Sequence, residues 1–398
     1  MNKQTFCSYP FNTVFIGADK AVKTCCSAIE SLGNLNDNTI DEILSGDKAR
    51  EVKDTILQGK WHSQCLQCKT IESVGGRSER SHAVEKDYDK FKDIVDKDFF
   101  RLEMVDVRWS NTCNLACNYC YEYFSSQWAS IKGIKVNAIK KDNEDTLLMF
   151  IEKNKDTVIN VNMLGGEPLL QKQNSPLIEI LNGKRFYVLT NLAVPMDSNK
   201  IANQLLKEDN AEWGVSFETV GKRYEYVRHN ASWDLFLQNL EYVEKIKPDI
   251  TLNAHPLYCT YSAFNLVEYY DFIHQHPIFS GVFWCVIQNI DELNVSKLSR
   301  QMKIKAIEEI DRVYSKYPNA SGVDHLLEIK SKMLETLEIK PNGVDRKFLK
   351  WTKTLEKKFL TDKEFNFKEL WPNLNDDVSK IKFLSNLRYL FSTSRHRS

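Results

Sequence analysis

The sequence predicts an α/β protein whose central part is a parallel sheet with helical crossovers. Strand-like and helix-like runs alternate from Met104 to Gln288, a cysteine-rich loop follows the first strand-like run, and a Gly-Gly-Glu-Pro turn follows the second. Repeated βα units at this spacing favour a parallel sheet, whose ligands bind beyond the carboxyl ends of the strands. The six expected strands are Val105–Trp109, Val158–Leu164, Arg185–Thr190, Trp213–Phe217, Ile250–Pro256 and Gly281–Ile287.

Length, amino-acid composition and net charge limit the classes of protein to which this chain can belong. The 398 residues allow two or three domains, and a hydrophobic content of 42% supplies a core. Basic and acidic residues number 54 each, and this zero net charge argues against a generic nucleic-acid binder. No apolar run approaches the length of about 20 residues that a membrane span needs. Ten cysteines without an export signal indicate metal or redox chemistry in the cytoplasm.

The loop after the first strand carries three cysteines in a CxxxCxxC pattern, Cys113, Cys117 and Cys120. Three thiolates at this spacing can hold three irons of a cubane cluster and leave the fourth iron open to a small ligand. Soft thiolates suit iron–sulfur clusters and zinc, but structural zinc usually takes a fourth protein ligand. The pattern therefore favours an iron–sulfur cluster with one open position.

A second group of cysteines lies in the first seventy residues. A hairpin is expected around Val14–Ile16, followed by an amphipathic helix over Thr39–Gln58 with Asn38 as its N-cap. A region this small needs a metal staple to fold stably, and four cysteines can hold either zinc or a [4Fe–4S] cluster. The candidate ligands are Cys7, Cys25 (alternatively Cys26), Cys65 and Cys68, since adjacent residues on a strand point to opposite faces.

The CxxxCxxC loop, with aromatic Tyr119 before its last cysteine, resembles the signature of radical S-adenosylmethionine (SAM) enzymes. The turn after the second strand resembles that family's GGEP motif, which holds the methionyl amino group of SAM. Ser216 and Arg228 match positions that contact the ribose and carboxylate of SAM in relatives, and Glu218 stands where the family often has Asp. The resemblance thus implies a SAM site that includes Gly165, Gly166, Glu167, Pro168, Asn191, Ser216, Glu218, Arg228 and Tyr119.

Residues 6–68 resemble the SPASM or shorter twitch module of the same enzymes, which binds an auxiliary iron–sulfur cluster. That module usually follows the catalytic barrel, whereas here it precedes it. In the family pattern a cysteine follows a Val-x-x step after the second hairpin strand. Val22 stands three residues before Cys25, so the resemblance favours Cys25 over Cys26 as the ligand.

The resemblance implies an open (β/α)6 TIM-like partial barrel with a small hairpin-plus-helix cluster domain before it and a helical region after it. The expected domains are 1–72 for the auxiliary cluster module, 73–103 for a linker, 104–290 for the partial barrel and 291–398 for a helical C-terminal cap.

The implied activity is reductive cleavage of SAM to a 5′-deoxyadenosyl radical, which abstracts a hydrogen atom from a substrate. Relatives with this module mostly act on peptide or protein side chains, by oxidation, cross-linking or epimerisation, and take electrons from a donor such as flavodoxin or ferredoxin. A small polar substrate such as a sugar or nucleoside is the alternative. A non-catalytic iron–sulfur redox or metal-binding protein is the alternative of another class, against which the GGEP turn and Arg228 argue.

Overall fold

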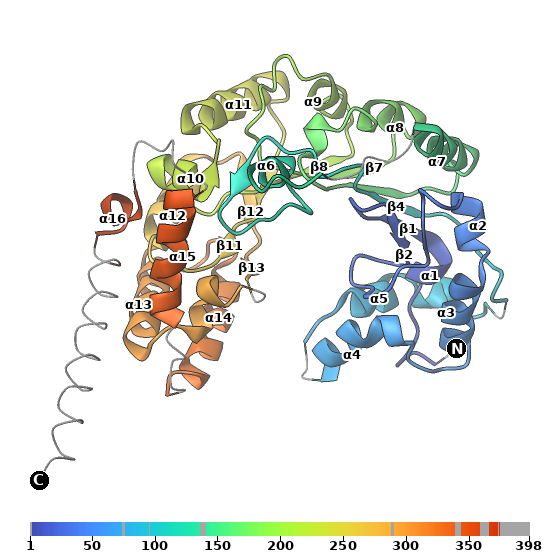
Figure 1. Cartoon of the computed structure of the whole chain (residues 1–398), viewed down its shortest axis with the longest axis horizontal. Helices are drawn as coiled ribbons and strands as arrows, with labels where there is room; N and C mark the ends of the chain where they lie inside the picture. The colour runs from blue at the N-terminus through green and yellow to red at the C-terminus, as the bar shows by residue number, and fades with distance from the viewer. Residues whose placement is uncertain are drawn as a thin grey trace, which may run out of the picture. The chain divides into compact units, whose positions relative to one another are not determined.

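The computed structural model describes residues 2–73, 76–94, 96–135, 141–287, 290–338, 344–358, 366–372 and 374 (Figure 1). The chain forms two compact units, each of which contains segments that are distant in sequence. Unit 1 consists of Met1–Asn114, Glu122–Thr190 and Val194–Trp213, and unit 2 of Leu115–Tyr121, Asn191–Ala193 and Gly214–Ser398. The cysteine loop passes from unit 1 to unit 2 and back.

Unit 1 is built on a mixed sheet with the strand order β8-β7-β6-β4-β1-β2-β3. Neighbours β7, β6, β4 and β1 are parallel, whereas β2 is antiparallel to both β1 and β3. The strands are β1 (Thr13–Ile16), β2 (Ala21–Lys23), β3 (Gly33–Asn34), β4 (Met104–Val107), β6 (Asn160–Met163), β7 (Arg185–Thr190) and β8 (Ala211–Val215), the last of which runs on into unit 2.

The N-terminal hairpin continues the barrel sheet. Strand β1 pairs with β4 in parallel, in a register that runs from Thr13 opposite Met104 to Ile16 opposite Val107. Beyond this pairing, the Arg108 backbone N–H donates to the Ile16 carbonyl at 2.9 Å. The cysteine-rich module and the first barrel strand therefore share one hydrogen-bonded sheet.

The helices of unit 1 cover this sheet and build the N-terminal module; α7, α8 and α9 follow one another along one face (Figure 1). The helical segments are α1 (Tyr9–Asn12), α2 (Ile40–Leu44), α3 (Asp47–Leu57), η1 (Ser63–Cys65), α4 (Leu66–Ser73), α5 (Glu79–Phe91), α6 (Ser126–Ile131), α7 (Lys141–Lys153), η2 (Pro168–Leu170), α8 (Asn174–Ile180) and α9 (Lys200–Leu205).

Two local expectations change in the module. The helix expected over Thr39–Gln58 is divided into α2 and α3 at Gly46, whose backbone is extended with φ −74° and ψ 166°. Its N-cap is Thr39 and not Asn38: the Thr39 side chain accepts from the Glu42 N–H, and the Glu42 carboxylate accepts from the Thr39 N–H. Such a reciprocal capping box satisfies two helix-end donors at once.

The stretch expected to be a linker that leads into a short helix contains helix α5. Helix α5 begins at Glu79 after its N-cap Ser78, whose side chain accepts from the Ser81 N–H, and its Ala83 and Phe91 are buried. Both side chains pack in one core with Phe6 and Ile56 of the module. Residues 79–91 are thus part of the module's core.

The two faces of the unit 1 sheet differ in polarity. Residues such as Val105, Val161 and Val188 alternate along the strands and are at most 1% exposed, as burial under the helices requires. The intervening positions carry Asp106 on β4 and Asn162 on β6, and these line cavities. One face is therefore an apolar core and the other a polar surface that small molecules can reach.

Unit 2 continues from β8 into β10 (Leu252–Ala254) and β12 (Phe279–Val282), which are parallel. Two small sheets pair β5 (Ala116–Cys117) with β9 (Arg228–His229) and β11 (Leu257–Tyr258) with β13 (Cys285–Val286). Its helical segments are α10 (Gly221–Val227), α11 (Trp233–Ile246), α12 (Leu266–Gln275), η3 (Asp291–Leu293), η4 (Val295–Lys297), α13 (Arg300–Lys316), α14 (Val323–Glu335), α15 (Val344–Lys358) and α16 (Phe367–Leu370).

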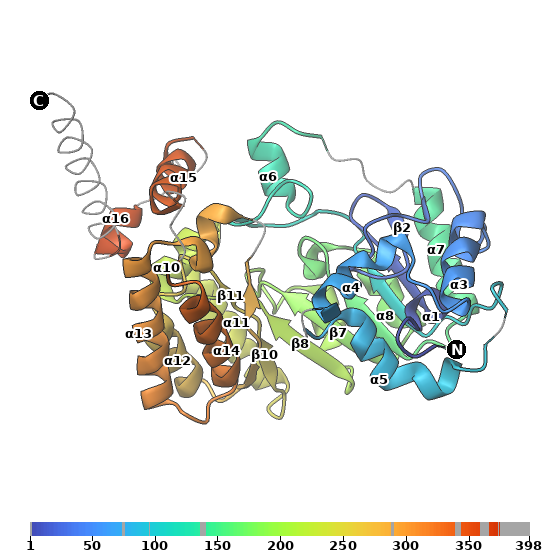
Figure 2. The ribbon, with the colours of Figure 1, turned by 90° about the horizontal axis from the view of Figure 1, so that it is seen from below.

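Helices α12, α13 and α14 lie side by side (Figure 2). Gly322 has φ +79° and is the N-cap of α14, in the break between α13 and α14. None of the described helices has the length and apolarity of a membrane span. The helical expectation for residues 375–398 lies outside the described part of the chain.

Candidate metal and cofactor sites

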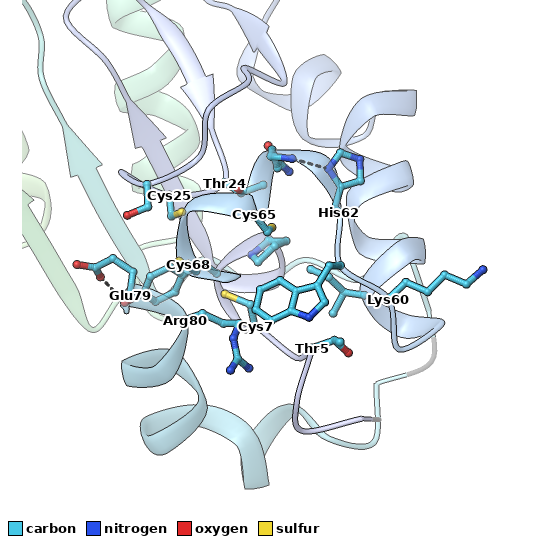
Figure 3. A pocket seen from close by; sticks show the side chains of 16 residues that line it. Thr5, Cys7, Thr24, Cys25, Lys60, His62, Cys65, Cys68, Glu79 and Arg80 are labelled. Atoms are coloured by element: carbon cyan, nitrogen blue, oxygen red, sulfur yellow. Dashed lines mark hydrogen bonds between the residues drawn. The ribbon is translucent and has the colours of Figure 1, made fainter. Parts of the chain in front are cut away.

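Four thiols of the N-terminal module line one cavity, shown in Figure 3. Cys7 precedes α1 and Cys25 follows β2, whereas Cys65 ends η1 and Cys68 lies in α4. Thiols from four distant positions of the module thus lie around one cavity.

The same four thiols are the right donors for a soft metal centre. Burial, and then the proximity of Cys25, raises the pKa of the Cys7 thiol. Burial raises the pKa of Cys25 to about 12 and that of Cys65 to about 11. Because metals bind thiolates, loading this site would release protons. Among the described residues, no group of three or more His, Cys, Asp or Glu side chains is arranged closely enough to hold a metal ion. The assignment of a metal to these four thiols therefore rests on the type of donor atom and on the cavity that they share.

Cys25 and Cys26 occupy different surroundings. Cys25 is in the wall of the four-thiol cavity, and Cys26 is not. Cys26 is exposed and lines a neighbouring cavity, whose wall also includes Cys25, Glu79 and Asp106. Because Cys25 alone of the two also lines the four-thiol cavity, the structure favours Cys25 as the proposed fourth ligand.

Replacement of these adjacent cysteines is expected to give opposite results. In a background that carries Cys113→Ala, Cys117→Ala and Cys120→Ala, a further Cys25→Ala should remove most of the remaining metal, whereas Cys26→Ala should leave it in place. Iron and zinc are counted by mass spectrometry after anaerobic reconstitution. About four irons in the Cys26→Ala variant would indicate a [4Fe–4S] cluster and about one zinc a structural site. Loss of metal from the Cys26→Ala variant alone would reverse the assignment.

The CxxxCxxC loop is anchored at both ends. In unit 1, the Cys113 N–H donates to the Ser126 hydroxyl, which donates back to the Cys113 carbonyl, both at 3.1 Å. In unit 2, Cys117 pairs with Arg228 across the β5–β9 ladder, and the Cys120 N–H donates to the Cys117 carbonyl at 2.9 Å. The backbone of the loop is therefore fixed at both ends.

The GGEP turn lies against the segment that leads into Cys113. Gly165 has φ +124°, in the region that favours glycine. A Cβ on Gly166 would collide with the Thr112 carbonyl and would lie 2.7 Å from that of Asn111. The Glu167 N–H donates to the Thr112 carbonyl at 2.8 Å. Two glycines thus permit a close approach that any side chain would prevent, which fits a turn that holds a ligand beside the loop.

Glu167 is fully buried, and its carboxylate already has protein partners. Its Oε1 accepts from the Thr190 hydroxyl at 2.7 Å and from the Leu169 N–H at 3.1 Å. Pro168, at the start of η2, is buried as well. The carboxylate is therefore held in one orientation by the last residue of β7 and by the backbone of η2.

Glu218, Tyr119 and Arg228 form a buried network in unit 2. The Tyr119 hydroxyl donates to both carboxylate oxygens of Glu218, at 3.2 and 3.0 Å. An Arg228 guanidinium N–H donates to Glu218 Oε2 at 2.7 Å, and the guanidinium lies 5.7 Å from the centre of the Tyr119 ring. Burial lowers the pKa of Arg228, but the Glu218 carboxylate, together with the nearby Tyr119 and Cys117, outweighs burial and the pKa is raised.

This network bears on the role expected for Arg228. Its Nε is buried without a hydrogen-bond partner among the described residues, and the same holds for the Thr219 hydroxyl. The guanidinium is thus paired through one N–H and retains a donor for a further acceptor. Of the other residues expected at the SAM site, Ser216 is partly exposed after β8, and Asn191 is buried with its side chain accepting from the Ala193 N–H at 2.8 Å.

Breaking the Glu218–Arg228 pair from one side should cost more than removing it whole. Arg228→Met alone or Glu218→Gln alone leaves a buried group without its partner and is expected to cost about 3–5 kcal/mol of unfolding free energy. Glu218→Gln combined with Arg228→Met should cost clearly less than the sum of the two single changes. Urea unfolding of the four proteins measures this, and strict additivity would contradict the coupling.

The polar face of the unit 1 sheet carries residues that the sequence did not single out. A cavity of about 210 Å³ is lined by Asp106, Arg108 and Asn162, and one of about 230 Å³ shares Met104, Asn162 and Tyr187 with it. Asp106 and Arg108 form an ion pair of 2.7 Å. The signal was present in the sequence, since strands buried on both faces are continuously apolar, and polar residues recur here at every second position.

Comparison with known protein families identifies two matching regions in the chain. Residues 107–273 match the radical SAM superfamily, and residues 7–69 match SPASM, an iron–sulfur cluster-binding domain. No protein of curated function matches the chain.

Among solved structures, the chain is similar to Streptococcus suis SuiB bound to the precursor peptide SuiA, at 18% identity and a TM-score of 0.40 over 69% of this chain and 61% of that one. It is also similar to anSMEcpe with bound AdoMet, at 16% identity and a TM-score of 0.41 over 55% of this chain and 62% of that one. The chain thus spans less than two thirds of the length of either structure.

The two matched regions contain both cysteine groups and follow one another in the order that the motifs predict. The fold of the described residues agrees, with parallel strands and crossover helices as in a partial barrel. The chain therefore belongs to the radical SAM superfamily and carries a SPASM iron–sulfur cluster-binding domain before its radical SAM region.

Proposed function

We propose that this radical SAM enzyme modifies a peptide or protein side chain. When bound, a reduced [4Fe–4S] cluster supplies the electron that cleaves SAM to methionine and a 5′-deoxyadenosyl radical, which abstracts a hydrogen atom from the substrate. In this proposal Cys113, Cys117 and Cys120 hold the catalytic cluster. The auxiliary cluster is held by Cys7, Cys25, Cys65 and Cys68.

The remaining residues bind and orient. The GGEP turn receives the methionyl amino group at the carboxylate of Glu167, which Thr190 holds in place at 2.7 Å. The unpartnered Nε of Arg228 is the donor left for the SAM carboxylate. Ser216 and Asn191 provide further polar contacts to SAM. Electrons come from an external donor such as flavodoxin or ferredoxin.

The observation that carries the peptide proposal is the polar face of the unit 1 sheet. Its two cavities, of about 210 and 230 Å³, share part of their walls and so form one continuous polar surface along the strands. Asn160 and Asn162 present side-chain amides there, which both donate and accept hydrogen bonds. Amide groups pair well with a polypeptide backbone. Cys26 and the proposed auxiliary ligand Cys25 both line the first of these cavities.

The test of activity is anaerobic reconstitution with iron and sulfide, followed by detection of 5′-deoxyadenosine with SAM and dithionite. The test of substrate class uses an extract of cells grown in deuterated medium and separated by size. Deuterium in 5′-deoxyadenosine should come from the peptide and protein fraction, and protease treatment of that fraction should remove it. Deuterium from the small-molecule fraction would establish the sugar or nucleoside class instead. Clusters without any SAM cleavage would indicate the redox-protein alternative.

A further inference from the structure

The turn of the N-terminal hairpin touches the chain on both sides of the CxxxCxxC loop, within unit 1. The Lys20 ammonium donates to the Trp109 carbonyl at 2.9 Å, four residues before Cys113. The Asp19 carboxylate accepts from the Tyr123 hydroxyl at 2.9 Å, three residues after Cys120. Two consecutive residues of one turn therefore bind the entry and the exit of the cysteine loop.

Lys20 is a buried cation with a strained backbone conformation. Its side chain belongs to a residue that is only 1% exposed, and its second hydrogen bond goes to the Ala18 carbonyl at 2.6 Å. Its backbone has φ +71°, a left-handed conformation that costs a residue other than glycine about 1 kcal/mol or more. Burial also lowers the pKa of the ammonium to about 8. A buried cation on a strained turn persists only where its contacts hold it there.

The hairpin turn is also packed closely against its neighbours. A Cβ on Gly17 would lie 2.5 Å from the Asp19 carboxylate and 2.8 Å from the Tyr123 hydroxyl. Asp19 is fixed in turn by the Ala21 N–H, which donates to it at 3.2 Å. Tyr123 is therefore packed onto the hairpin turn, and its hydroxyl has little freedom to move away from Asp19.

The turn is also connected rigidly to the barrel. It follows β1, which is paired with β4 up to Ile16 and Val107, and Trp109 stands two residues beyond that pair. A displacement of the hairpin would therefore move the point from which the cysteine loop departs.

We propose that Asp19 and Lys20 are positioning residues for the catalytic cluster, through which the cysteine-rich module sets the geometry of the CxxxCxxC loop. The inference rests on the proposed function only in assigning a cluster to that loop. The module then has a second role besides holding its own metal: it holds the two ends of the catalytic loop at a fixed separation. The coupling acts through the backbone of the loop, because both contacts are made outside the three cysteines.

Three variants test the contacts, and a fourth is the control. Lys20→Met keeps an unbranched side chain that is one atom shorter and removes both donations, Asp19→Asn keeps the size of the side chain, and Tyr123→Phe deletes one hydroxyl. The control is Lys23→Met on β2, where the ammonium also donates to a backbone carbonyl, that of Ala28 at 3.0 Å, inside the module. Thermal unfolding is measured for each protein, so that a general loss of stability is recognised.

The first readout is hydrogen–deuterium exchange of residues 110–124 in the metal-free protein. Faster exchange in Lys20→Met and Tyr123→Phe, with no change in Lys23→Met, is the expected result. This readout requires neither cluster nor activity, so its failure is distinguishable from failure of the proposed function. Exchange in Lys20→Met equal to that of the control would overturn the proposal. If Lys20→Met does not fold, the Tyr123→Phe comparison decides on its own.

The second readout is the reconstituted enzyme. To isolate the catalytic cluster, the variants are made together with Cys65→Ala and Cys68→Ala. The electron paramagnetic resonance signal of the reduced cluster with SAM should change in Lys20→Met, and the rate of SAM cleavage should fall at least about tenfold, as expected of a displaced reacting group. A signal and rate equal to those of the Lys23→Met control would overturn the proposal.

Discussion

Deletion of residues 1–72 is expected to abolish soluble, folded protein. The deletion removes β1, whose four residues pair with all four residues of β4. It also removes Val14 and Ile16, both 0% exposed, which lie beside Val105 and Val107 in the register and continue their apolar face. A buried aliphatic side chain is worth about 1.5–3 kcal/mol, against a total stability of about 5–15 kcal/mol for a typical domain.

The exposed edge adds a second cost. Without β1, strand β4 presents unpaired backbone groups and an apolar face, which is the usual template for edge-to-edge aggregation. The deleted chain should therefore appear in the insoluble fraction, or bind the dye ANS if it remains in solution. A soluble product with a cooperative thermal transition would show that the barrel is independent of the hairpin.

The matched control retains the hairpin and removes only the metal ligands. A chain with Cys7→Ala, Cys25→Ala, Cys65→Ala and Cys68→Ala keeps β1 and its pairing with β4. It is expected to remain soluble, because the sheet does not depend on the metal, although the segment around α4 loses its staple. The comparison separates the structural role of the hairpin from the metal-binding role of the module.

These expectations depend on a contact that the sequence did not reveal. The residue pattern locates the strands well: β7 begins and ends where predicted, and the hairpin and five other strands lie within a few residues of their predicted places. The pattern does not show which strands become neighbours, because Val14 and Val105 are ninety-one positions apart and are joined only by the closing of the sheet. A hairpin expected in a separate small domain is therefore found beside the first barrel strand.

The candidate site was likewise predictable only in part from the sequence. Motif spacing predicted that the GGEP turn would lie near the cysteine loop, since both follow neighbouring parallel strands. The partner of Arg228 was not predictable in this way. Glu218 differs from the frequent Asp by one methylene, and only the structure shows that this carboxylate reaches Arg228 and the Tyr119 hydroxyl together. Contacts made by long side chains depend on rotamers that the sequence does not specify.

Replacement of Cys113, Cys117 and Cys120 together by alanine is expected to abolish SAM cleavage. The proposed catalytic cluster has no other protein ligands, so the variant should lose all 5′-deoxyadenosine formation. Its iron content should fall from about eight to about four per chain if the N-terminal site also holds a [4Fe–4S] cluster. Iron counting and product detection after anaerobic reconstitution measure both quantities on one preparation.

The chain offers a control with the same number of changes. Its ten cysteines consist of three in the loop, four in the N-terminal cavity, and Cys26, Cys259 and Cys285. A Cys26→Ala, Cys259→Ala, Cys285→Ala protein should keep its iron and its SAM cleavage, at a modest cost in stability because Cys259 is fully buried. If this control loses activity as the loop variant does, at least one of the three remaining thiols serves the reaction, and Cys26 beside the polar cavity is the first to restore.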